Sequence, residues 1–178
     1  MNNYPSTTCR LPPLSKLRNW HLSFDGSSIA RGGGAGIVLS CPTLTSTAAV
    51  KLDFKCTNNE AEYKTFILGL LIALDRQISR LYIDGDSKLI VKQISGEFAI
   101  REPSLASYRT IIQKLLSRFT IVRLAHVSRS VNRYPDALAT LASKLDIFGP
   151  TQQITVYKQT QPAIASLLPL EDLLIGAA

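Results

Sequence analysis

Hydrophobic and polar residues alternate along the first part of the chain, as they do in strands that bury one face. Three such runs predict strands over residues 18–25, 35–40 and 47–54. A turn is expected at the Gly-Gly-Gly of residues 32–34, and Pro42 should end the second strand. Three consecutive strands with short connections indicate an antiparallel meander, with Asp25 at the end of the first strand.

Farther along, the apolar residues take up the spacing of helices. After Asn58 or Asn59, either of which is a good N-cap, apolar residues recur every three or four positions as one stripe: Tyr63, Phe66, Ile67, Leu70 and Leu74. The elements expected next are a strand over 80–84, a short helix from Ser87 through Ile94, a helix that opens at Pro103, a strand over 120–126 and a helix over 135–144. The residues expected to face inward from the last two helices are Leu105, Tyr108, Ile111, Ile112 and Leu115, and then Leu138, Leu141 and Leu145. This order predicts an α/β fold with a mixed five-stranded sheet, three antiparallel strands followed by two more, flanked by helices.

Length and composition set the domain organisation that we expect. The chain has 178 residues, of which 46% are hydrophobic, which suffices for one core and is too little for two. We therefore predict a flexible leader over 1–17, one domain over 18–146 and a poorly structured tail over 147–178. The net charge of +7 favours a polyanionic partner.

The cysteines and the N-terminal residues bear on the compartment. Cys9, Cys41 and Cys56 are scattered and lack the CxxC spacing of a zinc site, so a reduced intracellular compartment, nucleus or cytoplasm, is the simplest interpretation. Residues 1–24 carry basic residues and no acid, a weak likeness to a transit peptide that keeps organelle import as an alternative. No apolar run approaches the roughly 18 residues of a membrane span, so no membrane partner is expected.

Four short segments each supply a carboxylate close to the beginning or end of a predicted element. They are DGSS at 25–28, TNNEAEY at 57–63, DGDS at 84–87 and NRYPDALA at 132–139. Carboxylates that lie together repel one another unless cations neutralise them, so clustered acids in an apolar frame predict a divalent metal site. Oxygen ligands without His or Cys suit Mg²⁺ or Mn²⁺. The chemistry indicated is metal-assisted phosphodiester cleavage.

Two of these segments contain a pair of acids. Glu60 and Glu62 lie about 200° apart around a helix, so both cannot face one metal site. Asp84 and Asp86 would share one face of a strand, so strand alternation does not choose between them.

In order and context, the four segments resemble the type 1 ribonuclease H family, and most closely the ribonuclease H domain of plant gypsy-type LTR retrotransposon polyproteins. The resemblance rests on DGSS, GAGIVL, NNEAEY, GDSKLIVKQISGEF and NRYPDALATLASKL, and it covers residues 20–145. It implies a ribonuclease H-like fold and two Mg²⁺ ions, with Mn²⁺ as a substitute. The catalytic and metal-binding acids that it implies are Asp25, Glu62, Asp86 and Asp136. The NNxxE pattern selects Glu62 over Glu60, and the Ser that follows the family's third acid selects Asp86 over Asp84.

The resemblance also implies substrate-binding positions. These are the backbone of Gly26 and Ser27 and the side chains of Thr57, Asn58, Lys88 and Arg129. Asn58 could equally be no more than a helix cap. Lys88, Lys92 and Arg101 could line a basic groove or form an ordinary solvated face.

The loop before the fourth acid is short, with residues 127–131 between His126 and Asn132. Cellular relatives carry a long loop there with a His that assists product release. His126 stands at the right count but is expected on the last strand, as an ordinary core or edge histidine. Arg129 is then the alternative occupant of that role, and it can act only electrostatically.

The function implied is hydrolysis of the RNA strand of RNA/DNA hybrids by a monomer that uses a two-metal mechanism. The alternative is a catalytically weak or inactive, retrotransposon-derived module that binds nucleic acid. Four acids at the family's spacing favour the enzyme, and the absence of a linked polymerase favours the module. A reverse transcriptase and an integrase of a parent polyprotein are the further partners implied.

Overall fold

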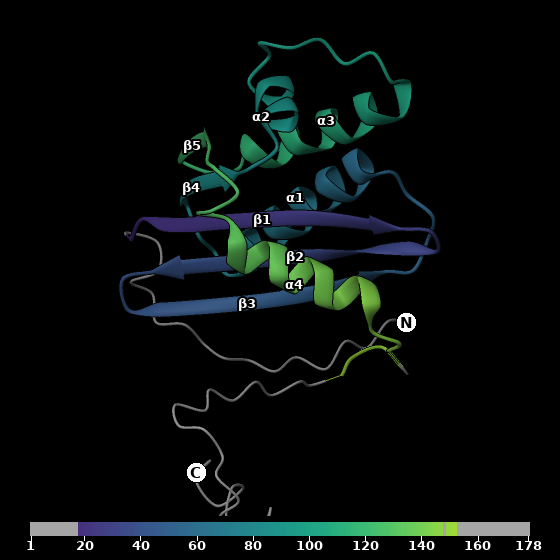
Figure 1. Cartoon of the computed structure of the whole chain (residues 1–178). Helices are drawn as coiled ribbons and strands as arrows, with labels where there is room; N and C mark the ends of the chain where they lie inside the picture. The colour runs from purple at the N-terminus through teal and green to yellow at the C-terminus, as the bar shows by residue number, and fades with distance from the viewer. Residues whose placement is uncertain (1–17, 148, 153–178) are drawn as a thin grey trace, which may run out of the picture. The chain divides into compact units, whose positions relative to one another are not determined.

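The alternating runs form the strands of one mixed sheet, in a computed structural model that describes residues 18–147 and 149–152 (Figure 1). The strands are β1 (Trp20–Ile29), β2 (Gly32–Cys41), β3 (Leu44–Leu52), β4 (Arg80–Gly85) and β5 (Ile121–His126). The helices are α1 (Asn58–Asp75), α2 (Lys88–Ile94), α3 (Pro103–Leu116) and α4 (Arg133–Lys144). The strand order is β3-β2-β1-β4-β5. The predicted α/β class and the mixed five-stranded sheet are confirmed.

The sheet has an antiparallel half and a parallel half, which meet at β1. β1 pairs antiparallel with β2, and β2 antiparallel with β3. On its other side β1 pairs parallel with β4, and β4 parallel with β5. Helix α4 packs against β1, β2 and β3, whereas α1 packs against β1 and β2 from the other face (Figure 1). The sheet is therefore a central layer between helices.

The core lies between the sheet and α1. Phe24 of β1 stacks on Phe66 of α1, with ring centroids 4.6 Å apart. The predicted stripe of α1 is confirmed for Tyr63, Phe66, Ile67 and Leu70, which are buried, and Leu74 packs against them while half-buried. Each such fully buried apolar side chain contributes about 1.5–3 kcal/mol relative to exposure. Burial of this stripe fixes α1 on β1.

The first strand is longer than predicted, and the expected glycine turn is wrong. Pairing of β1 with β2 continues beyond Asp25 as far as Ile29, opposite Gly32, so the turn consists of Ala30 and Arg31. Of the three glycines, Gly34 instead makes room for α4. A Cβ on Gly34 would lie 2.0 Å from the carbonyl oxygen of Ala139. Glycine can signal a turn or a close backbone approach, and here it signals the approach.

Helix α1 begins at a different cap from the one predicted. Thr57 is the N-cap, since its hydroxyl accepts a hydrogen bond from Glu60 N at 3.2 Å. Glu60 Oε2 in turn accepts from Thr57 N at 2.7 Å. This reciprocal capping box satisfies two N–H groups and leaves Asn58 as the first helical residue. The prediction of Asn58 or Asn59 as the cap is wrong.

Three smaller differences remain. One concerns the bounds of a strand, and two concern residues that were expected to be buried. The third strand runs over Leu44–Leu52 and not 47–54, because Leu44 already pairs with Cys41 across the turn. Leu141 and Ile111, expected to face inward, are exposed. Helix α4 approaches the sheet closely through small residues such as Ala139 and so has a narrow buried stripe, which leaves Leu141 outside.

Contacts divide the chain into two units, of which the first ends at Asp146. The predicted leader lies outside the described residues, as does the predicted tail except for residues 147 and 149–152. No helix in the described part of the chain has both the length and the apolar character needed to cross a membrane.

Candidate metal centre

Three carboxylates from three elements meet beside the end of the parallel half of the sheet. Asp25 lies in β1, Glu62 in the first turns of α1, and Asp86 directly after β4. One oxygen from each lies within 4.8 Å of the others. They form a group that could hold a metal ion, and we call it the acidic triad.

Strand pairing and a close helix approach bring the triad together. The parallel pairing of β1 with β4 ends at Phe24 opposite Gly85, so Asp25 and Asp86 follow at neighbouring positions. Helix α1 reaches the same point because Gly26 has no side chain. A Cβ on Gly26 would lie 2.4 Å from Glu62 N. Gly26 therefore allows the start of α1 to place Glu62 beside Asp25.

Burial and mutual repulsion make Asp25 and Glu62 costly to ionise. Asp25 and Glu62 are 7% and 5% exposed. Burial, and then the charge of Asp86, raises the pKa of Asp25 to about 7. Burial, and then the charges of Asp25 and Asp86, raises the pKa of Glu62 to about 9. A bound cation would reverse these shifts, because it favours the ionised carboxylates.

One atom of the triad calls for a positively charged or donating partner. Glu62 Oε2 is buried and has no hydrogen-bond partner among the described residues. An unpaired buried carboxylate oxygen is costly, since it has lost its contact with water. A divalent cation bound by the triad would satisfy it, and an all-oxygen donor set suits Mg²⁺ or Mn²⁺. The residues present therefore fit a metal of this kind.

The structure separates the acids that the sequence offered in pairs. Glu62 lies in the triad, while Glu60 is occupied by the capping box. Asp86 lies in the triad, while Asp84 is half-buried within β4, opposite Ser23 of β1.

The fourth predicted acid, Asp136, is exposed in the first turn of α4 and is not part of the triad. It is nevertheless close enough to Asp25 to raise the pKa of that carboxyl through its charge and a side-chain hydrogen bond. Asp136 is thus at the periphery of the same site.

The loop between β5 and α4 also reaches the triad. His126 is the last residue of β5, an edge strand, and its Nε2 lies 3.2 Å from the main-chain oxygen of Asp86. Arg129 Nε lies 3.9 Å from Asp86 Oδ2, and its side chain is 92% exposed. Both residues that competed for one role in the sequence therefore lie beside Asp86, with His126 at its backbone and Arg129 at its carboxylate.

A residue that sequence reasoning did not single out fastens this loop to β1. Asn132 is 1% exposed, and its Nδ2 donates to the carbonyl oxygen of Phe24 at 2.9 Å. In the sequence, Asn132 only begins the segment at 132–139, and nothing there indicates a partner 108 positions away.

The predicted substrate-binding residues differ in how far they are exposed around the site. Gly26 is buried against α1, and Ser27 is half-buried. Thr57 is exposed at the cap, where its hydroxyl accepts from Glu60 N and keeps its own proton free to donate. Asn58 and Lys88 are exposed at the first positions of α1 and α2.

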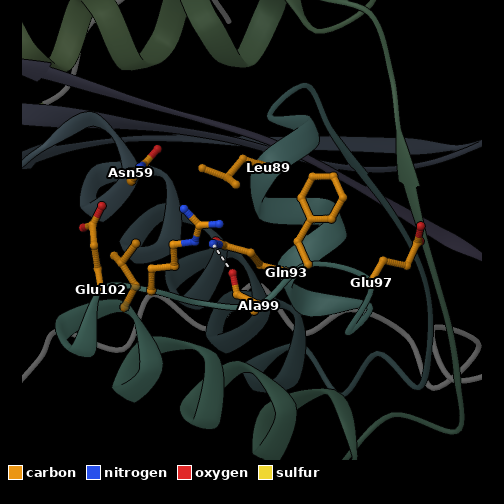
Figure 2. Close-up of a pocket in the computed structure, with 9 residues that line it drawn as sticks. Asn59, Leu89, Gln93, Glu97, Ala99 and Glu102 are labelled. Atoms are coloured by element: carbon orange, nitrogen blue, oxygen red, sulfur yellow. Dashed lines mark hydrogen bonds between the residues drawn. The ribbon is translucent and has the colours of Figure 1, made fainter.

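A cleft of about 480 Å³ lies between the start of α1, helix α2 and the segment that leads into α3 (Figure 2). Its lining residues are Asn59, Leu89, Gln93, Glu97, Phe98, Ala99, Arg101, Glu102 and Leu105. Gln93 is held at its wall, since its Nε2 donates to Ala99 O and its Oε1 accepts from Tyr63 OH. Of the three cations weighed for a basic groove, Arg101 lines the cleft, Lys92 is paired with Glu97, and Lys88 is exposed.

Comparison with known proteins places this site in a family. Residues 23–142 match the family described as Reverse transcriptase-like. Ribonuclease HI of Halobacterium salinarum is 32% identical over 126 residues, which are 68% of this chain and 63% of that protein. The crystal structure of RNase H1 from the same archaeon aligns with a TM-score of 0.66 at 31% identity, covering 70% of this chain and 96% of that one. The chain belongs to the ribonuclease H-like family.

Two further structures share the ribonuclease H-like fold of this chain. The N-terminal RNase H domain of rv2228c from Mycobacterium tuberculosis has a TM-score of 0.61 at 31% identity, over 70% of this chain and 93% of that one. LC11-RNase H1 in complex with an RNA/DNA hybrid has a TM-score of 0.62 at 23% identity, over 69% and 95% of the two chains, and this likeness concerns the fold alone. The chain spans 63% of the Halobacterium protein and 33% of the bifunctional protein Rv2228c.

Proposed function

We propose that this chain hydrolyses the RNA strand of RNA/DNA hybrids with two divalent cations held by Asp25, Glu62, Asp86 and Asp136. The observation that carries the proposal is the buried acidic triad, in which Glu62 Oε2 has no partner among the described residues. Membership of the ribonuclease H-like family and relatives named for ribonuclease H support the same reaction. The triad supplies the hard oxygen ligands that Mg²⁺ prefers, with Mn²⁺ as a substitute.

The four acids would hold the cations in different ways, according to where each one lies. When bound, the cations would supply an activated water and positive charge for the leaving oxygen. Asp25 lies in β1 and belongs to the triad together with Glu62 and Asp86, and it would be the central ligand. Asp136 is exposed and is the most peripheral.

Substrate would approach across the exposed side of the triad. The backbone at Gly26 and Ser27 lies next to Asp25, where it could read the 2′-hydroxyl that separates RNA from DNA. The exposed Thr57 and Asn58 offer donors for a phosphate of the second strand. The cleft that Asn59 lines also carries a half-exposed aromatic ring, Phe98, together with Arg101.

A second candidate is a catalytically weak or inactive nucleic-acid-binding module. The short loop before Asn132 favours it, because cellular relatives carry a long loop with a His at this place. Descent from a plant gypsy-type retrotransposon, association with a reverse transcriptase and an integrase, and a nuclear or cytoplasmic location remain proposals of the same kind.

Cleavage of a labelled RNA/DNA hybrid in Mg²⁺ or Mn²⁺ separates the two candidates. Asp25→Asn and Glu62→Gln should each abolish cleavage, since each removes a ligand from the buried triad. The matched controls Glu60→Gln and Asp84→Asn should retain most of it, because those acids lie outside the triad. A wild-type chain that binds hybrid without cutting it would favour the module. A folded Asp84→Asn protein without activity would overturn the choice of Asp86.

A further inference from the structure

The loop between β5 and α4 holds the backbone just before two of the triad acids. Asn132 Nδ2 donates to the carbonyl oxygen of Phe24, the residue before Asp25. Val127 N donates to the carbonyl oxygen of Gly85, the residue before Asp86, at 3.0 Å. Both carbonyls lie where the parallel pairing of β1 and β4 ends. The residues that follow β5 thus hold the ends of both β1 and β4.

The Asn132 side chain does not act as a helix cap. Asn132 occupies the N-cap position of α4, yet its side chain makes no capping hydrogen bond. Its amide instead turns to β1, and its Oδ1 is buried without a partner in the described part of the chain. A buried amide oxygen without a partner destabilises the folded state, because it has lost its hydrogen bonds to water. Stability alone therefore does not explain why the side chain is buried there.

The same residue links the two ends of the metal site. Its side chain holds the strand at Phe24, one residue before Asp25, while its main-chain oxygen accepts from Asp136 N at 3.2 Å. One residue therefore fixes both the strand that carries Asp25 and the helical turn that carries Asp136.

We propose that Asn132 is a positioning residue that sets the Asp25 and Asp136 carboxylates for cation binding through its hydrogen bond to the Phe24 carbonyl. The proposal rests on the proposed function for the identity of the site. Partners that orient metal ligands typically change metal affinity or activity about 10–100-fold when they are removed. Asn132→Ala should therefore weaken Mn²⁺ binding by about ten-fold or more, and lower kcat more than it raises KM.

Two readouts and a control separate positioning from plain stability. Mn²⁺ affinity is measured without substrate, by calorimetric titration well below the melting temperature, beside the thermal unfolding of each variant. Asn132→Ser is the second variant. Ser is a good N-cap that restores helix stability, but its hydroxyl, on Cβ, is too short to stand in for an amide nitrogen one bond farther out. Lys51→Met is the matched control, because Lys51 Nζ donates to Ser143 O and Leu145 O at the other end of α4.

If Asn132 positions the carboxylates, both Asn132 variants should lose Mn²⁺ affinity. Asn132→Ser should do so with little loss of melting temperature. Lys51→Met should have a lower melting temperature and an unchanged Mn²⁺ affinity. An Asn132→Ser protein with wild-type Mn²⁺ affinity would overturn the inference, as would equal losses of affinity in Lys51→Met. A wild-type chain that binds Mn²⁺ but fails to cut hybrid would overturn the proposed function and leave this comparison of affinities intact. A wild-type chain that binds no Mn²⁺ would overturn both.

Discussion

Asp86 receives one contact from the last residue of β5 and one from the loop that follows, and the two differ in kind. His126 Nε2 meets its main-chain oxygen, whereas Arg129 Nε faces its carboxylate at 3.9 Å. The guanidinium keeps its charge at every accessible pH and cannot transfer a proton. Arg129 can therefore act on the carboxylate or on a nearby phosphate, while His126 acts on the backbone.

This difference predicts unequal effects of removing the two side chains. Arg129→Ala should lower turnover about ten-fold or more, which corresponds to about 1.4 kcal/mol or more of transition-state stabilisation. His126→Ala should change turnover little once losses in folding are corrected, because its contact is to a carbonyl. Steady-state kinetics on hybrid, with unfolding curves for both variants, makes the comparison. The reverse order would show that the short loop presents an imidazole to the reaction.

Single residues could be predicted where a motif fixed their spacing. The NNxxE count chose Glu62, and the following Ser chose Asp86, and both lie in the triad. The cap at Thr57 was missed because Asn58 and Asn59 are also good caps and only the geometry of Glu60 decides among them. The hydrogen bond from Asn132 to the Phe24 carbonyl could not be predicted, because it depends on where the pairing of β1 with β4 ends.

At the scale of elements, the distance of α4 from the sheet depends on two glycines of β2, Gly34 and Gly36. A Cβ on Gly36 would lie 1.9 Å from the carbonyl oxygen of Pro135, which is main chain and cannot turn aside. Since α4 carries both Asn132 and Asp136 at its start, its position over β2 also sets one side of the metal site.

Gly36→Ala should therefore force α4 away from β2 and destabilise the fold by about 1–3 kcal/mol, the usual cost of overpacking. Thermal or urea unfolding measures the loss, with Thr45→Ala at an exposed position of β3 as the control. Unchanged stability in Gly36→Ala would mean that α4 does not pack as closely as the structure describes.

Element types were predictable because their periodicities are long and distinct, as in the α1 stripe. Element ends were less so. The glycine run of residues 32–34 was assigned to a turn because nothing local shows that α4, from about 100 residues later, packs on Gly34. Leu141 was assigned inward because hydrophobicity alone cannot tell that small residues already fill the buried stripe of α4.

For the whole molecule, the sheet could be anticipated from the order of its elements. Three short-linked strands pair antiparallel, and strands that follow helices return parallel, as β4 and β5 do. What the order cannot give is how far each pairing runs. That length decides that Asp25 and Asp86 emerge side by side at the point where β4 ends.

The triad couples the stability of the whole chain to pH and to divalent cations. The pKa values of Asp25 and Glu62 are raised in the folded state to about 7 and about 9, from about 4 in an unfolded chain. Protonation of these groups therefore favours the folded state. Their contribution to stability is fully present below about pH 4, and it is lost as pH rises through about 7 for Asp25 and about 9 for Glu62.

The metal-free chain should accordingly lose stability between about pH 5 and pH 9, and Mg²⁺ or Mn²⁺ should restore it most strongly at the alkaline end. Cations bind the ionised carboxylates of the native state, and protons compete with them at low pH. Melting temperatures across this range, with and without Mg²⁺, measure both effects. The Asp25→Asn/Glu62→Gln double variant keeps the shape of the site and removes both titrations, so its melting temperature should depend less on pH and respond little to cations. If Mg²⁺ stabilises the double variant as much as the wild type, the cations bind elsewhere on the chain and the triad is not the metal site.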